Sequence, residues 1–585
     1  MNCAKVKYQI EETTPKTFLR ADDVFYYDSM TVYEKYSSFI DRIARLAPLV
    51  PTPEPEVVDM TIYEKEYEKI YKDNSDLNEK ASDESETFPN KAEEVPKNMF
   101  AASNTLADSL KGFVPVKRKG KFVFRGMSNF TPDLRKILNK GISGIEKELR
   151  EYHDRPYNYN LQRAVCHFRL WHTRFLDDNY ITSQDCHDAL LRVPFLPPKT
   201  LHEALQSIWS VLCFISLCGN SPDLGRLDLI LAPYLKDILT DGIYDAKEQK
   251  RLLQSFFSKI TDNGEKYRMT LSLCGSDDEV KTALFILYAI CDGKFENFSV
   301  YVTADRSTDR ALIKKIRNLT EHSKCKLYFC DEEKIKKILS AYGVSDDDTS
   351  SFTIGKYGEI QIAGNSNFTH ENADGFALLK KILEKIRNEH SAVSSSDELY
   401  TLFIFEFEEY ISDIISKEKK HRNQSDDPGK WKWAAEAFPC EVVSVFIGDC
   451  PKNGRRFSRG GARYNFFSPI LVSLHAALRM LETFGVLIDS CDRTSIPDLA
   501  RTYIKYIDDA DYLQNANDTV LSDKTAQLEK KAEKIYLNVI SSSNGSPLLI
   551  TPCFEEEKTT ESINNIADIF DKLFDSDRYI ISLSE

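Results

Sequence analysis

From about residue 121 onwards, segments with helical periodicity alternate with short, apolar segments that favour β-strands. The strand-like segments are RMTLSLCG at residues 268–275, NFSVYVT at 297–303, KLYFC at 326–330 and SFTIG at 351–355. Helix-like stretches such as DEVKTALFILYAICDG separate each of them from the next. Parallel strands need long crossover connections of this kind. The alternation therefore predicts a parallel α/β sheet or barrel.

The first hundred residues differ in composition from the rest of the chain. Residues 1–50 contain aromatic-rich segments that predict helices, whereas residues 51–97 are acidic and contain Pro and Ser with few aliphatic side chains. Such a segment buries too little apolar surface to offset its ordering entropy, so we expect a disordered linker. Residues 98–585 are expected to form one large domain.

Charge, hydropathy and cysteine use exclude several classes of function. The formal net charge of −14 argues against binding to nucleic acid or to an anionic membrane, because both require clustered Lys and Arg. A secretory leader and an apolar run of about 18 residues are both absent from the sequence, which predicts a cytoplasmic protein with no membrane partner. The thirteen irregularly spaced cysteines predict reduced thiols rather than a disulfide framework.

Candidate cofactor and metal motifs have the wrong spacing. His167 and His172, like Cys325 and Cys330, are five residues apart, which places no two ligands on one ion. The GGARYN segment at residues 460–465 lacks both the Walker and the Rossmann spacing, and its glycines favour a tight turn or close packing. The sequence thus predicts no metal and no cofactor.

Five segments occur in the order and approximate spacing found in one enzyme family. They resemble motifs of the pyruvate formate-lyase-like glycyl radical enzymes and cover roughly residues 125–510. The resemblance implies an α/β, ten-stranded barrel of two parallel half-barrels packed antiparallel and surrounded by helices, with one loop threaded through its centre. The segments are FTPDLRKILNKGISGI at 130–145, the run from LHEALQ to YLKDI at 201–238, MTLSLCG followed by NFSVYV, GVSDDDTSSFTIGKYGEIQIAG at 343–364, and the GGARYN segment with its flanks at 455–478.

The sequence departs from the family pattern at the residues that carry radical chemistry. Tyr357 falls where the family's central loop, GVSxEDAxDYxIxGCVEPxxxG, has the cysteine that becomes a thiyl radical. A phenol O–H bond is weaker than the alkyl C–H bonds that these enzymes attack, so a tyrosyl radical would be a poor abstractor. The family's RVxGYS loop, whose glycine stores the radical, is not found before Glu585, so residues 98–585 are expected to be a barrel domain truncated before that motif.

Five residues form the candidate site that the resemblance implies. Glu359 falls where dehydratase members of the family have a general base, and it is either a base with a raised pKa or a structural carboxylate. Tyr357 is expected to fill a pocket or to form a hydrogen bond. Asn297 and Ser299 match the family at positions implied to bind substrate, whereas Tyr301 replaces its usual arginine. An anionic substrate would lose its bidentate partner there.

The leading hypothesis is a catalytically degenerate homologue, a pseudoenzyme that binds a partner protein or a small ligand through the retained scaffold. One alternative is a lyase or a formate acetyltransferase-like enzyme of anaerobic metabolism whose radical domain is supplied in trans by a separate subunit. Another is a repurposed acid–base enzyme that uses Glu359 and Tyr357. The resemblance also allows a homodimer, or a heterodimer with an intact paralogue. In each case Arg226 and Asp228 are expected to form an internal salt bridge.

Overall fold

The computed structural model places most of the chain beyond residue 128. Apart from a few helical positions between residues 37 and 45, the predicted N-terminal helices, the acidic linker at 51–97 and residues 98–115 lie outside the described residues. The described ranges are 116–118, 121–123, 128–176, 184–218, 220–240, 246–262, 267–295, 298–320, 324–355, 358–388, 393–423, 440–457, 460–507, 521–543, 549–550, 558–559, 566–575 and 580–583.

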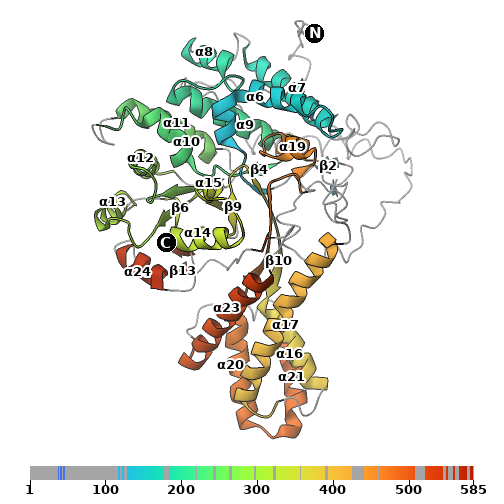
Figure 1. Cartoon of the computed structure of the whole chain (residues 1–585). Coiled ribbons are helices and arrows are strands. Elements are labelled where there is room, and N and C mark those ends of the chain that lie inside the picture. The colour runs from blue at the N-terminus through green and yellow to red at the C-terminus, as the bar shows by residue number, and fades with distance from the viewer. Residues whose placement is uncertain are drawn as a thin grey trace, which may run out of the picture.

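The larger body contains the predicted alternation of strands and helices (Figure 1). Some of its helices begin at a side-chain cap: Asp133 accepts the Lys136 N–H at the start of α6, and Ser276 and Glu279 form a capping box on α12. Its elements are β1 (Val116–Arg118), β2 (Lys121–Val123), β3 (Ser128–Phe130), α6 (Leu134–Glu151), α7 (Asn158–Thr173), η3 (Arg174–Leu176), α8 (Gln184–Arg192), α9 (Leu201–Leu217), β4 (Ser221–Pro222), α10 (Leu227–Leu235), α11 (Lys247–Asp262), β5 (Tyr267–Ser272), α12 (Asp277–Gly293), β6 (Phe298–Ala304), α13 (Arg310–Thr320), β7 (Lys326–Asp331), α14 (Glu332–Ala341), α15 (Asp346–Thr349), β8 (Phe352–Ile354), β9 (Ile360–Ile362), α18 (Glu441–Val445), α19 (Cys450–Asn453), β12 (Leu549–Ile550), β13 (Lys558–Thr559), α24 (Ile566–Asp575) and β14 (Ile580–Leu583).

Strands β5, β6 and β7 are parallel and buried on both faces, as the sequence predicted. Side chains alternate between the faces of a strand, so each strand contributes to two cores. The outer residues, such as Met269, Val300 and Phe329, pack into the core shared with the helices of the larger body. The inner residues of β6 and β7, such as Tyr301 and Tyr328, belong to the second core.

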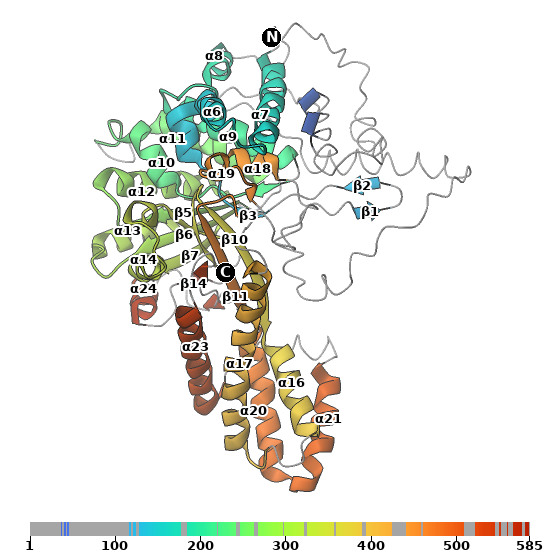
Figure 2. The same ribbon diagram turned by 45° about the vertical axis from the view of Figure 1, so that its right-hand side comes forward.

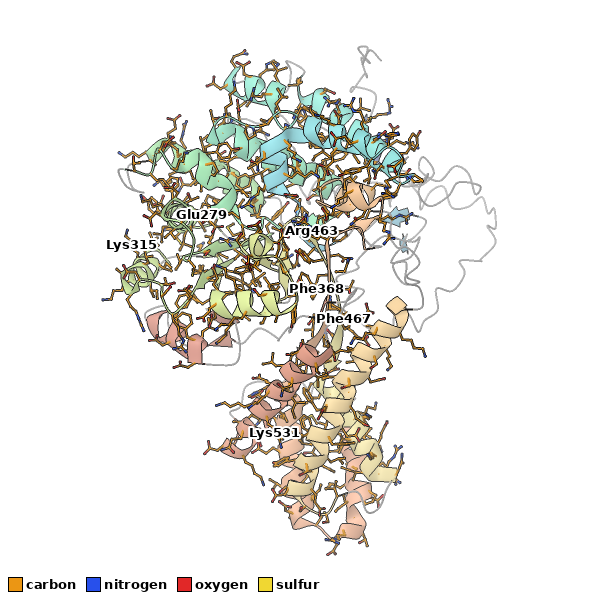
Figure 3. The ribbon with its side chains drawn as sticks, viewed as in Figure 1. Glu279, Lys315, Phe368, Arg463, Phe467 and Lys531 are labelled. Atoms are coloured by element: carbon orange, nitrogen blue, oxygen red, sulfur yellow. The ribbon has the colours of Figure 1, made fainter. Side chains whose placement is uncertain are left out.

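A group of helices forms an arm that extends from the larger body (Figure 2). Two long parallel strands, β10 (Ser366–Asp374) and β11 (Tyr464–Val472), lead into it, and Figure 3 shows Phe368 and Phe467 at the neck between the two bodies. Apolar residues at helical spacing, such as Leu378, Ile382 and Ile386 of α16, fill the arm's core. The arm consists of α16 (Gly375–Asn388), α17 (Ser396–Asn423), α20 (Leu474–Ser490), η6 (Arg493–Ser495), α21 (Ile496–Ile507) and α23 (Asp523–Ser543).

The sheets agree with the expected α/β class but not with every detail of the expected barrel. The described strands form separate sheets, of which the largest have the orders β13-β14-β7-β6-β5 and β10-β11-β12. Strand β14 is antiparallel to β7, whereas β5, β6 and β7 are parallel to one another. A continuous ten-stranded barrel is therefore not present among the described strands. Among the described residues, the helices that follow β10 and β11 build the arm.

Glu441, at the start of α18, is 4% exposed, and burial raises its pKa to about 7 although Arg456 opposes the shift. Because the pKa of Glu441 is higher in the folded than in the unfolded protein, its protonation stabilises the fold fully at pH values below the pKa of the unfolded state. This stabilisation is lost as the pH rises through about 7. Glu441→Gln should therefore be more stable than the parent at pH 8 by about 2–3 kcal/mol, and the advantage should shrink towards pH 4.5. Denaturant unfolding at several pH values measures this.

The matched control for that experiment is Glu408→Gln, which changes an exposed glutamate of α17. The control should leave the pH dependence of stability unchanged. Equal pH profiles for Glu441→Gln and the parent would show that the buried carboxyl is not neutral at pH 6.

Two further findings concern the described residues as a whole. None of their helices is both long enough and apolar enough to cross a membrane. The described cysteines form no disulfides with one another.

Candidate functional site

Residues 343–364 form a loop whose tip is the β8–β9 hairpin, with Phe352 opposite Ile362. The Gly355 N–H donates to the Glu359 carbonyl at 2.9 Å, and the Gly358 N–H donates to the Gly355 carbonyl at 3.2 Å. Gly358 has φ +74°, which a short hairpin turn with a bulge requires of its last residue. Tyr357 belongs to this turn by sequence but lies outside the described residues, so its role stays a prediction.

The residues on either side of the hairpin turn pack closely around Glu359. The side chain of Glu359 is fully buried, and Gln361 Nε2 donates to its Oε1 at 2.7 Å. A Cβ atom on Gly355 would lie 1.9 Å from Glu359 Oε1 and 2.4 Å from Gln361 Nε2. A glycine is therefore needed at position 355 so that the carboxylate can occupy this space.

Tyr301 connects the loop to the inner face of the sheet. Its hydroxyl donates to the Gly355 carbonyl at 3.2 Å, and its ring stacks on Tyr328 with centroids 4.6 Å apart. Tyr301 and Glu359 thus both lie against Gly355. Ser299 is half-buried two residues earlier on β6, and Asn297 lies outside the described residues.

Arg268 lies beside the candidate site but is not among the residues that the sequence predicted for it. It lies on β5 in register with Ser299, is 8% exposed, and forms an ion pair with Asp223 at 2.9 Å. Burial opposes its charge, but Asp223 and, more weakly, Tyr301 and Glu359 raise the pKa of Arg268 above its ordinary value. The signal that would have found it is polar alternation, since every second residue of β5 from position 268 is polar.

A buried polar cluster lies at the carboxyl ends of β5, β6 and β7. Glu332 accepts hydrogen bonds from the hydroxyls of Ser272, at 2.6 Å, and Thr303, and it pairs with Lys336 at 2.7 Å. Burial would raise the pKa of Glu332, but Arg226, Lys336 and the hydroxyls lower it overall. The cluster therefore holds an ionised carboxylate.

The predicted salt bridge between Arg226 and Asp228 is confirmed. The guanidinium contacts both carboxylate oxygens, at 2.8 and 2.9 Å for the shorter contacts, and both side chains are buried. Arg226 Nη1 also donates to the Ser350 carbonyl at 2.9 Å, and Asp228 accepts the Ser272 N–H at 2.9 Å. The pair therefore attaches the central loop to β5.

A second attachment, which we call the latch, joins the loop to the start of β11. Asp348 accepts hydrogen bonds from Arg463 Nη1 and from the Tyr464 hydroxyl, each at 2.8 Å. Arg463, which Figure 3 labels, also contacts Asp449 at 2.9 Å. Burial would raise the pKa of Asp348, but these donors lower it. Gly461 allows the backbone before Arg463 to pass close to Arg455, because a Cβ at position 461 would lie 2.4 Å from the Arg455 carbonyl oxygen.

A pocket of about 380 Å³ lies at the base of the central loop. We call it the loop-base pocket. Thr131, Asp133 and Lys136 line it from the start of α6, and Ser351, Ala363 and Asn365 line it from the loop; other lining residues include Arg135, Lys140, Glu148, Arg226, Asp348, Asp449 and Arg463. Its volume is within the range of small-molecule sites.

The sequence is similar to those of known proteins. A profile of the family described as "Pyruvate formate lyase-like" matches residues 116–272. Over these residues the chain is similar to the pyruvate formate lyase-like proteins. It is also 22% identical over 302 residues to the trans-4-hydroxy-L-proline dehydratase of Clostridioides difficile, and this match covers 47% of the chain and 38% of that relative.

Solved structures of glycyl radical enzymes share the fold of this chain. The B12-independent glycerol dehydratase of Clostridium butyricum aligns with a TM-score of 0.67 at 14% identity, over 97% of this chain and 90% of that one. A glycyl radical enzyme from Archaeoglobus fulgidus aligns with a TM-score of 0.67 at 13% identity, over 97% and 91% of the two chains. At this identity the likeness establishes the fold alone.

The ionisable side chains around the central loop already have hydrogen-bond or ion-pair partners, which limits the chemistry that they can perform. The carboxylate of Glu359 accepts the Gln361 amide, and the guanidinium of Arg268 pairs with Asp223. Groups that are buried and already paired hold a structure together more readily than they move protons. Among the described residues, His, Cys, Asp and Glu side chains do not gather into a group of three that could hold a metal ion.

Proposed function

We propose that this chain is a non-radical member of the pyruvate formate lyase-like proteins and that it acts by binding a small ligand. Its scaffold is two half-barrels, β3 to β7 and β10 to β14. Support for this scaffold comes from the parallel bridge between Gly225 and Met269, which joins the segment after β4 to β5, and from the antiparallel β7–β14 junction.

The packing of the loop tip carries this proposal. In a radical enzyme of this family the tip presents a thiol, whereas here the sequence places Tyr357 between two turn glycines. The adjoining carboxylate of Glu359 is fully buried and bonded to Gln361, and Tyr301 contacts the turn itself. These contacts favour a loop that is held in place over one that presents a reactive atom to substrate.

One observation favours the alternative of a lyase whose radical domain is supplied in trans. Cys330 is fully buried on β7, in register with Thr303 on the inner face, and packs in the same core as Tyr301 and Tyr328. A thiol in that position lies on the correct side of the sheet for hydrogen abstraction. Such an enzyme would pair with a separate glycyl radical subunit or with an intact paralogue.

Anaerobic incubation with a radical-SAM activase, alone and with an added glycyl radical subunit, tests the proposal. Electron paramagnetic resonance should show no radical on this chain, and glycerol, 1,2-propanediol and trans-4-hydroxy-L-proline should remain unconverted. The glycerol dehydratase of Clostridium butyricum is the positive control. Turnover by the parent chain that Cys330→Ser abolishes would reject the non-radical proposal and establish the alternative.

A further inference from the structure

The loop-base pocket contains charges that the fold has already paired and charges that it has not. Lys136 contacts Glu148 at 2.8 Å, and Arg463 contacts Asp348 and Asp449 at 2.8 and 2.9 Å. By contrast, Arg135 is exposed and forms no ion pair with any described residue. Lys140 reaches Glu148 only at 3.9 Å and is 59% exposed. The two cations of the lining that have no short ion pair, Arg135 and Lys140, are therefore both exposed.

The inner end of the pocket offers acceptors instead. Asp133 caps α6 through Oδ1, which accepts the Lys136 N–H at 2.9 Å, and burial raises the pKa of this carboxyl although the cap opposes the shift. The hydroxyl of Thr131 is 3% exposed and has no hydrogen-bond partner among the described residues. A buried hydroxyl without a partner is costly, so the site gains from a ligand that bonds to it.

These two ends define the chemistry of an occupant. A cationic donor beside Asp133 would stabilise its ionised form, and an ammonium group could also bond to the Thr131 hydroxyl. Asp133 and Lys140 are seven residues apart, which is about 10 Å along a helix, and Arg135 lies between them. If the same ligand carries an anionic group a few carbon–carbon bonds away from its ammonium group, that anionic group would therefore reach Arg135 or Lys140.

We propose that the loop-base pocket binds a small zwitterion, with its ammonium group at Asp133 and Thr131 and its carboxylate at Arg135 or Lys140. This inference rests on the proposed ligand-binding function. Ser351, Ala363 and Asn365 line the same pocket, so the occupant lies against the base of the central loop between its two attachments. Binding should therefore raise the melting temperature of the full chain.

Isothermal titration calorimetry of the full chain tests the inference. The probes are ω-amino acids of three to six carbons, each with the alkylamine and the carboxylic acid of equal length. At least one amino acid should bind ten-fold or more tightly than its amine and its acid. Asp133→Asn, which keeps the helix cap, should weaken that binding at least ten-fold. Arg135→Gln or Lys140→Gln should do the same.

The control variant is Lys147→Gln, because Lys147 is an exposed cation of α6 that does not line the pocket. It should bind the amino acids like the parent. The inference is wrong if no amino acid binds better than its matched amine and acid, or if Lys147→Gln weakens binding as much as the pocket variants. Neither result bears on radical chemistry, which the resonance experiment decides separately.

Discussion

Replacing Asp228 with asparagine should lower the free energy of unfolding by about 3–5 kcal/mol. The substitution keeps the shape of the side chain and an acceptor for the Ser272 N–H, but it removes the negative charge beside Arg226. The guanidinium is then left as a buried charge, 4% exposed, without its bidentate partner. Chemical denaturation followed by circular dichroism measures the loss.

The matched control is Asp571→Asn, which breaks the ion pair of Arg310 with Asp571, whose side chains are 63% and 45% exposed. Water screens this pair, so its loss should cost less than about 1 kcal/mol. Equal effects of the two substitutions would show that burial does not set the strength of the Arg226–Asp228 pair. The Asp228 variant should also make the central loop easier to cleave by protease, since Arg226 holds the Ser350 carbonyl.

Local signals account for the parts of the fold that were predicted correctly. The strands at residues 268–275, 297–303 and 326–330 were predicted because both faces of a buried parallel strand need apolar or small side chains. The helix-like stretch DEVKTALFILYAICDG at residues 278–293 forms most of α12, which a capping box of Ser276 and Glu279 begins. The Arg226–Asp228 pair was predictable because its members are two residues apart.

The latch and the arm were beyond sequence reasoning for a different reason. Asp348 and Arg463 are 115 residues apart, and only the tertiary fold brings them to 2.8 Å. The helices of the arm show ordinary amphipathic patterns, which specify that each has a buried face but not which neighbour covers it. The loop-base pocket likewise combines residues from four distant segments of the chain, so no single sequence motif predicts it.

A further large effect is expected from Gly364→Ala, at the end of the central loop. Gly364 has φ +72°, and a Cβ there would lie 2.4 Å from Asp133 Cβ and 2.5 Å from Asp133 Cα. The Gly364 N–H donates to the Thr131 carbonyl at 2.9 Å, so the backbone has little freedom to move away. The substitution should lower the free energy of unfolding by about 3–5 kcal/mol, combining backbone strain with steric overlap.

Gly343→Ala, at the start of the same loop, separates these two contributions. Gly343 has φ +77°, yet a Cβ there would meet nothing within 4 Å, so only the strain of the left-handed conformation applies. Its cost should be about 1–2 kcal/mol. The difference between the two variants measures the overlap of position 364 with the start of α6. If the two glycines prove equally replaceable, the loop does not pack against Asp133 in solution, and the loop-base pocket loses one of its walls.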